Sequence, residues 1–352
     1  MLYIMPLHDN DSDLYDEYVR KHPLSTLYHL FYFKKVIENT YHHRSFYQIA
    51  LDERKRIVGV LPVFYFRSIF LGDSLISLPF CDYGGILADS AEVYAKLFNR
   101  AIELCTQLKS EDIELRQTEK INFSDNSQLP EQNLRVNTGK VRMTLELPDT
   151  SDALFASFPA KLRSQIRKPQ KEGCYSVNGG IELLDDFYDV FTHNMRDLGS
   201  PVHSRSLMKN MLIEDPLHTR IFVVYHDKIP VACSLVGGYK DVLVNPWASF
   251  KRSNQKIAPN MMLYWEMLRF AIENNYRHFD FGRSTPDEGT YKFKAQWGAV
   301  PHQLYWYSYN KKTGMGNPGT LNSRSTFIRV WQKLPLAVTR AFGPVIRRGI
   351  HL

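Results

Sequence analysis

Cysteine is scarce in this chain of 352 residues, and its few copies are scattered. The four cysteines form no C-x-x-C pair: Cys81, Cys105, Cys174 and Cys233. This spacing provides neither a zinc-binding nor a redox motif, and it fits a reducing cytoplasm. The histidines are too isolated to suggest a metal site, so no metal ligand is expected.

Long hydrophobic runs are also missing. The best, Val58 to Phe66, contains Gly59 and Pro62 and falls far short of the ~20 apolar residues that span a bilayer. The first residues, MLYIMPLHDNDSD, lack the basic start of a secretory signal. We therefore expect a cytoplasmic protein.

The nucleotide-binding fingerprints G-x-x-x-x-G-K-[ST] and G-x-G-x-x-G are absent. What is present is the composition of a folded protein, with 44% hydrophobic and 23% charged residues. The length favours two domains rather than one.

Acidic residues are missing from one end of the chain. Residues 289–352 contain no Asp or Glu and ten Lys or Arg, whereas the rest has 34 basic against 37 acidic residues. The net charge of +7 therefore belongs to the C-terminal end. This pattern favours a local anionic partner, such as a membrane surface or a phosphate-bearing ligand, and it predicts no DNA partner.

An order of strand, charged turn, strand, helix and strand occurs twice. The turn centres (54 and 227), helix starts (91 and 259) and closing strands (113 and 279) differ by 173, 168 and 166 positions. Near-constant offsets predict a duplicated α/β (α+β) domain with mixed central sheets flanked by helices. The expected ranges are 1–147, 148–312 and a tail at 313–352.

The stretch from Arg277 to Gly298, RHFDFGRSTPDEGTYKFKAQWG, concentrates the candidate site. It predicts a strand at 278–281, a turn at Gly282, and a short helix capped by Thr290. Ligands of α/β proteins usually bind at such strand ends. The candidate substrate-binding residues here are Arg283, Ser284, Tyr291, Phe293 and Trp297. Core or pocket wall is the alternative for the aromatic ones.

Two basic segments precede this stretch. In KLRSQIRKPQKEG, helical spacing places Arg163, Arg167 and Lys171 on one ridge until Pro169 kinks or ends the helix. Arg163, Arg167 and Lys168 can grip phosphates, although a solvated basic face is equally expected. In KRSNQKIAPN, Lys256 and Asn260 approach a helix N-terminus, a natural anion site.

Taken together, these segments resemble the FemAB family of aminoacyl- and peptidyltransferases. The likeness is carried by LRSQIRK, NMRDLGSP, NPWASF, APN-MLYW and FDFGRS…GTYKFKAQWG. IVGVLPVFYFRS and SLPFCDYGG resemble the FemAB-related subgroup found beside exopolysaccharide and PEP-CTERM/exosortase systems. The resemblance implies two tandem GNAT-like domains, and an aminoacyl group moved from charged tRNA to an amine of a peptidoglycan precursor, without metal.

The resemblance also assigns roles to single residues. It implies Lys294 as stabiliser of the oxyanion that forms when an amine attacks an ester carbonyl. Asp280 would orient or deprotonate the amine, unless its role is structural. Arg283 and the basic ridge would hold donor or acceptor phosphates. No tightly bound cofactor is implied, and the acyl donor is either aminoacyl-tRNA or acyl-CoA.

The tail, residues 313–352, combines apolar residues such as Trp331 with basic ones at helical spacing, and Pro335 and Pro344 are expected to break it. It would lie on an anionic inner-membrane surface or pack on the domains. The overall expectation is a transferase that acylates an amine of an envelope or exopolysaccharide precursor. The alternatives are an acyl-CoA-dependent N-acyltransferase of small molecules and a catalytically silent scaffold of exopolysaccharide machinery.

Overall fold

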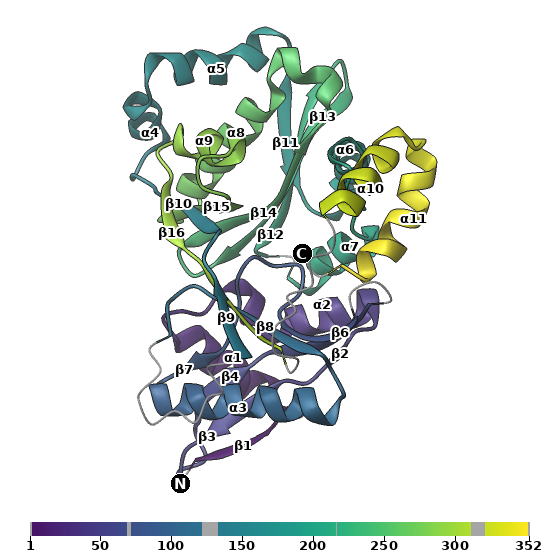
Figure 1. Cartoon of the computed structure of the whole chain (residues 1–352). Coiled ribbons are helices and arrows are strands. Elements are labelled where there is room, and N and C mark those ends of the chain that lie inside the picture. Colours follow the sequence, from purple (N-terminus) through teal and green to yellow (C-terminus); the bar gives the residue numbers. More distant parts are fainter. Residues whose placement is uncertain (1, 69–71, 122–132, 216, 311–320, 351–352) are drawn as a thin grey trace. The chain divides into compact units, whose positions relative to one another are not determined.

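The computed structural model describes residues 2–68, 72–121, 133–215, 217–310 and 321–350 (Figure 1). The chain forms two compact units. Unit 1 comprises residues 1–141, 303–317 and 349–352, and unit 2 comprises 142–302 and 318–348.

The units differ from the predicted ranges at the first crossing, after the second unit and in the tail, of which residues 318–348 belong to unit 2. The first crossing lies at 141/142, and residues 303–317 return to unit 1 instead of closing the second domain. The reason is β17 (Tyr305–Asn310), which pairs antiparallel with β8 (Asp112–Gln117) and with β9 (Leu134–Asn137). A strand from the end of the chain thus completes the first unit's sheet.

Unit 1 holds two sheets, of order β1-β3-β4-β7 and β2-β5-β6-β8-β17-β9. The remaining strands are β1 (Tyr3–Pro6), β2 (Arg44–Ser45), β3 (Gln48–Leu51), β4 (Ile57–Leu61), β5 (Val63–Ser68), β6 (Gly72–Ser77) and β7 (Leu87–Ala88). The helices are α1 (Ser12–Lys21), α2 (Phe31–Tyr41) and α3 (Ala91–Gln107). The predicted helix at 91–109 is confirmed as α3, which buries Val93, Leu97, Ala101 and Leu104.

The apolar run at 57–66 predicts a single strand, and this prediction is wrong. Pro62 interrupts it, because proline cannot donate a ladder hydrogen bond. The two pieces go to different sheets: β4 pairs with β3, and β5 pairs with β6.

Unit 2 is built on one sheet of order β11-β12-β13-β14-β15-β10-β16. The strands are β10 (Val141–Glu146), β11 (Tyr175–Gly179), β12 (Thr219–His226), β13 (Ile229–Tyr239), β14 (Val242–Phe250), β15 (His278–Ser284) and β16 (Val300–Gln303). The helices before the tail are α4 (Ser151–Ser157), α5 (Ala160–Lys171), α6 (Leu184–Leu198), α7 (Arg205–Glu214), α8 (Pro259–Glu273) and α9 (Gly289–Ala295).

The predicted duplication is visible in the topology. In unit 1 the antiparallel pair β5–β6 is followed by α3 and by β8, which runs parallel to β6. In unit 2 the antiparallel pair β13–β14 is followed by α8 and by β15, which runs parallel to β14. The fold class, mixed sheets flanked by helices in tandem, is confirmed.

The strands β14 and β15 pair with each other along only a short part of their length. Their parallel register covers Val242–Val244 against His278–Asp280, although β14 continues to Phe250 and β15 to Ser284. Past this register the two strands no longer pair with each other, although β14 continues to pair with β13, and the candidate site lies beside this end of β14.

The tail forms α10 (Leu321–Lys333) and α11 (Leu336–Arg348), here called the tail helix pair. Pro335 separates the two helices as predicted, but Pro344 lies inside α11 and does not break it. The pair packs on α6 and the loop after it: Arg340 donates to Asp189 and Thr192, and Arg347 donates to His203. In the described part of the chain, no helix is both long and apolar enough to cross a bilayer.

Gly343 lies at a close contact between the tail and the loop after α6. A Cβ at this position would lie 2.8 Å from Val202 Cγ1 and 3.0 Å from the Val202 backbone nitrogen. We expect G343V to lower the free energy of unfolding by about 1–3 kcal/mol through overpacking, and to speed proteolysis within α11. Urea unfolding and timed trypsin digestion measure this. The control A341V changes an exposed position of the same helix; equal behaviour of the two variants would contradict the described packing.

His203 should make stability depend on pH. Burial, and secondarily the neighbouring Arg347, hold the pKa of this imidazole well below its usual 6.5. Below about pH 6.5, His203 is therefore protonated in the unfolded chain but stays neutral in the folded chain. The unfolding free energy consequently falls as the pH is lowered. Urea unfolding at pH 7.5 and 5.5 should show a smaller loss in H203Q than in wild type. The control H8Q, which changes an exposed histidine, should lose as much unfolding free energy between pH 7.5 and 5.5 as wild type does. If H203Q loses the same amount, His203 is not the source of the pH dependence.

Candidate functional site

Lys294 is buried on the inner side of α9. Only 8% of it is exposed, and its Nζ donates to the carbonyl oxygens of Gly282 at 3.1 Å and Arg283 at 2.7 Å. Lys292, two positions earlier, is exposed. Lysines two positions apart on a helix are expected to face different directions, and the structure confirms this for Lys292 and Lys294. A short helix thus fixes one ammonium group against the turn that ends β15.

The turn itself is fixed by Asp280. Its Oδ1 accepts from the backbone N–H of Gly282 at 2.7 Å, and its Oδ2 accepts from Arg142 Nε at 2.6 Å. Asp280 is fully buried, and Arg142 lies on the adjacent strand β10. Gly282 has φ +75°, a conformation that favours glycine. The carbonyls that hold Lys294 therefore depend on a buried ion pair.

This geometry bears on the role of Asp280. Both carboxylate oxygens are engaged, and Asp280 is not among the residues that line a described cavity. The contacts are those of an anchor for the turn. A role in deprotonating the acceptor stays a prediction.

A cavity of about 300 Å³ lies next to Lys294. It is lined by the end of α6, the end of β14, the start of α8, and α9. The lining consists of Asn194, Leu198, Ala248, Ser249, Phe250, Asn260, Leu263, Tyr264, Gly289, Thr290, Phe293 and Lys294. Of the predicted site residues, Lys294, Phe293 and Asn260 are therefore brought together.

The lining is mostly apolar and carries one charge. None of its residues is acidic, and Lys294 supplies the only cation among them. Asn194 Nδ2 donates to Ser249 Oγ at 2.9 Å, which leaves a polar pair on the wall. Burial raises the pKa of Tyr264 to about 12, so its hydroxyl is neutral at physiological pH. Such a site favours a ligand that is apolar with a polar or negatively charged end.

Aromatic rings support this wall from behind. Tyr264 stacks on Phe281 with ring centroids 5.6 Å apart, and its centroid lies 5.0 Å from that of Phe293 and 6.1 Å from that of Trp297. Phe281 and Trp297 are almost entirely buried. The interpretation of the aromatic residues as core or pocket wall therefore fits the observed packing.

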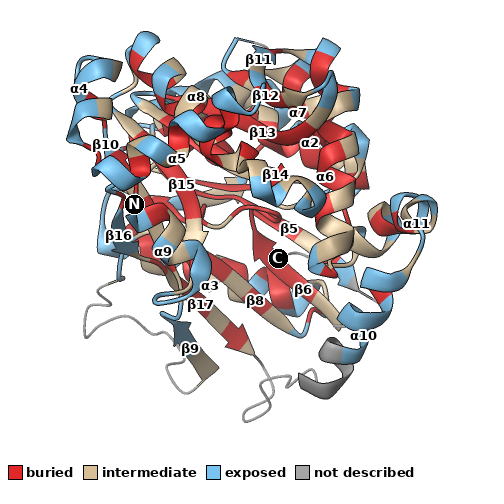
Figure 2. Ribbon diagram, turned by 90° about the horizontal axis from the view of Figure 1, so that it is seen from above, coloured by how far each residue is buried: buried red, intermediate tan, exposed pale blue. Residues whose placement is uncertain are grey.

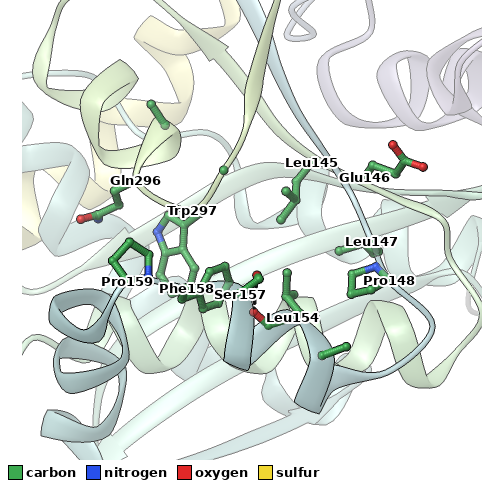
Figure 3. A pocket seen from close by; sticks show the side chains of 13 residues that line it. Leu145, Glu146, Leu147, Pro148, Leu154, Ser157, Phe158, Pro159, Gln296 and Trp297 are labelled. Atoms are coloured by element: carbon green, nitrogen blue, oxygen red, sulfur yellow. Dashed lines mark hydrogen bonds between the residues drawn. The ribbon is translucent and has the colours of Figure 1, made fainter.

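Trp297 faces a second, separate groove of about 620 Å³ (Figure 3). This groove is lined by the end of β10, α4, the Ser157–Pro159 segment and the end of α9. The indole N–H of Trp297 is buried and has no hydrogen-bond partner among the described residues. Trp297 and Phe293 thus line different hollows, and the structure does not unite them in one.

The predicted basic ridge lies on α5, and none of its residues lines either hollow. Arg163 donates to the carbonyl oxygens of Ala156 and Phe158, and the Arg167 guanidinium lies 4.9 Å from the Phe155 ring centroid. Lys168 is exposed. Pro169 does not end the helix, which runs to Lys171. Phosphate binding by this ridge stays a prediction.

The other predicted residues are more dispersed. Lys256 is exposed in the loop before α8, and Tyr291 and Arg283 are partly exposed. Ser284 is buried, and its hydroxyl has no partner among the described residues. The predicted Thr290 cap is wrong, because α9 already begins at Gly289 after Glu288.

Comparison with known proteins shows which domain family part of this chain resembles. A family model described as "Acetyltransferase (GNAT) domain" matches residues 156–295, the segment that contains β11 to α9. Residues 156–295 form a GNAT-type domain. No curated protein matches the chain.

Solved structures resemble the whole chain. FemX has 14% identity and a TM-score of 0.66, and the match covers 86% of this chain and 96% of FemX. A tandem GNAT protein from the clavulanic acid biosynthesis pathway has 12% identity and a TM-score of 0.57, with 90% and 100% covered. L-PGS from Bacillus licheniformis has 11% identity and a TM-score of 0.56, with 94% and 98% covered. At such identities the likeness concerns the fold.

Sequence reasoning missed several site residues. Arg142 was not singled out because its partner is 138 positions away. Three further cavity residues lie in segments that carried the family resemblance: Asn194 of α6, Ser249 of β14 and Tyr264 of α8. The signal that could have found them is their position on the side of each element that faces the cavity. In the described residues, no group of three or more His, Cys, Asp or Glu is arranged to hold a metal.

The Arg142–Asp280 pair should be costly to break. We expect R142M to lower the unfolding free energy by about 3 kcal/mol, because it removes the Arg142 charge that lies against the buried Asp280 carboxylate. The control R205M removes an ion pair with Asp185, whose side chain is 83% exposed, and should cost less than about 1 kcal/mol.

Urea unfolding of both variants measures the difference. The double variant R142M/D280L should recover part of the loss, since it removes both charges. If R142M is no less stable than R205M, the pair does not hold the turn.

Proposed function

We propose that this protein is an acyl- or aminoacyltransferase whose reaction takes place in the cavity beside Lys294. The acyl group would lie between β14 and α9. The acceptor would be an amine of a cell-envelope or exopolysaccharide precursor. This agrees with the GNAT-type domain and with the FemX-like fold, and the precursor class comes from the family resemblance.

The observation that carries the proposal is the placement of the Lys294 ammonium. Two backbone carbonyls hold it at the wall of a mostly apolar cavity without an acidic residue in the lining. Burying an ammonium group costs free energy, even when backbone carbonyls accept its hydrogen bonds. Its cost is explained if the site receives a negatively charged group.

The chemistry follows from the charge that appears in acyl transfer. The acceptor amine attacks the donor's carbonyl carbon, the carbonyl oxygen becomes an oxyanion, and the tetrahedral species collapses with loss of the donor's alcohol or thiol. A fixed cation at the oxyanion stabilises the transition state more than the substrate. Lys294 would supply that cation, and the amine proton would pass to solvent or to the leaving group.

The donor distinguishes two versions of the reaction. An ester donor would be an aminoacyl-tRNA, and a thioester donor would be acyl-CoA. Both place the same carbonyl in the cavity, and both carry phosphates that the exposed cations Lys256 and Lys168 would approach from outside.

The test replaces each of the two lysines of α9 by methionine in a separate variant. With a donor that supports turnover, we expect K294M to lower kcat by about 10²-fold or more, as for removal of other oxyanion donors, with a smaller effect on KM. K292M is the matched control, because Lys292 is exposed on the same helix. Product formation is followed by mass spectrometry, with an amine acceptor and either acetyl-CoA or aminoacyl-tRNA.

Thermal shift with each donor accompanies the assay, because a ligand that binds the folded state raises the apparent stability. Turnover in K294M equal to that of K292M would contradict the assigned role. Absence of both binding and turnover with either donor, in a folded wild-type protein, would favour a scaffold.

A further inference from the structure

The tail helix pair, α10 and α11, has one face that is fixed to unit 2. On α10, Gln332 donates to the carbonyl oxygen of Asp197 at 3.0 Å, and Trp331 is only 4% exposed. On α11, Arg340 Nη2 lies 3.0 Å from Asp189 Oδ1, and Arg347 Nε lies 3.0 Å from His203 Nε2. Because these contacts hold one side of each helix, the opposite side has a defined outward orientation.

The outward side is unusually apolar for a protein surface. The exposed fractions are 56% for Val330, 59% for Phe342 and 71% for Val345. Phe342 and Val345 are three positions apart on α11, so they lie on one face. Figure 2 shows exposed residues along both helices. Folded proteins rarely expose an aromatic ring and branched aliphatic side chains together unless something covers them.

Cations accompany these apolar side chains. Arg329 and Lys333 on α10 and Arg348 on α11 are exposed and form no ion pair with any residue that the structure describes. Residues 289–352 contain no Asp or Glu that could neutralise them. The outward face therefore combines insertion-competent apolar groups with uncompensated positive charge.

We propose that this face binds the surface of an anionic lipid bilayer, with α10 and α11 lying in the headgroup region. Amphipathic helices bind in this way when aromatic and aliphatic side chains enter the acyl boundary while Lys and Arg contact lipid phosphates. A nucleic acid would match the cations but gains little from Val330 and Val345. A protein partner with an acidic surface would leave the same aliphatic groups without an apolar counterpart.

The tail helix pair also contacts an element that lines the cavity. Leu198, at the end of α6, lines the cavity beside Lys294, and its neighbour Asp197 accepts the hydrogen bond from Gln332 of α10. The tail helix pair and the cavity therefore both contact the C-terminal turn of α6.

The test is vesicle co-sedimentation of the full chain. The probes are vesicles with about a third phosphatidylglycerol, a strongly anionic composition, and vesicles of phosphatidylcholine alone. The wild type should bind the anionic vesicles and not the neutral ones. The apolar variant F342S/V345S and the charge variant R329Q/K333Q/R348Q should each bind about tenfold more weakly, since both kinds of contact are required.

Matched controls use exposed residues elsewhere. L217S removes a leucine that is 82% exposed, and R54Q/K120Q/K209Q removes three exposed cations; both should bind as wild type does. Equal melting temperatures verify that the tail variants are folded. Wild type that fails to bind anionic vesicles would overturn the proposal. Tail variants that bind anionic vesicles as well as wild type would also overturn it. The same holds if only the charge variant loses vesicle binding and tRNA competes with the vesicles for the wild type.

A second readout reports insertion directly. V345C, labelled with an environment-sensitive dye, is accessible, whereas the four native cysteines are all buried. Its emission should shift to the blue on addition of anionic vesicles, and that of labelled L217C should not. An unchanged V345C spectrum with vesicle-bound protein would place the contact elsewhere and overturn the assignment.

Discussion

The structure of the site depends on the buried carboxylate of Asp280. One oxygen binds Arg142 of β10, and the other binds the amide of Gly282 at the end of β15. The turn fixed in this way presents two carbonyl oxygens to Lys294. A buried ion pair contributes little net stability by itself but is costly to leave incomplete. Here it specifies the conformation of the turn, and through the turn the position of the ammonium group.

The rest of unit 2 surrounds this arrangement. The register between β14 and β15 ends at Val244 and Asp280, and beyond it the space next to β14 is filled by side chains of α6, α8 and α9 and by a cavity. The rings of Phe281, Tyr264 and Phe293 form a rigid wall. A reaction that develops negative charge gains most from such a setting, because a dry, preorganised cation needs no reorganisation.

Local pattern predicted much of this fold. Alternating apolar residues predicted the strand at 278–281, which lies in β15, and the amphipathic face of residues 91–109 predicted α3. The pattern failed where long-range pairing decides the outcome. Pro62 divided one apolar run between two sheets, and β17 joined β8 across nearly 200 positions.

The candidate site shows the same division. The two-residue spacing of Lys292 and Lys294 predicted that only one lysine could face a site, and burial shows which. Helical spacing also predicted the basic ridge of α5. It could not predict that Arg163 would bind carbonyls of α4 and of the segment before its own helix, or that neither hollow would include the ridge. No local sequence pattern identifies Arg142, because its partner Asp280 is distant in the sequence. The order of the strands in the sheet brings the two residues together.

The central claim is that an acyl carbonyl lies between β14 and α9, next to Lys294. A crystal structure with a non-reactive donor, either a thioether analogue of acyl-CoA or an amide analogue of the aminoacyl-adenosine end of tRNA, tests it most directly. The account predicts the carbonyl oxygen, or the atom replacing it, within about 3 Å of Lys294 Nζ. A donor bound with its acyl end outside this cavity would contradict the account.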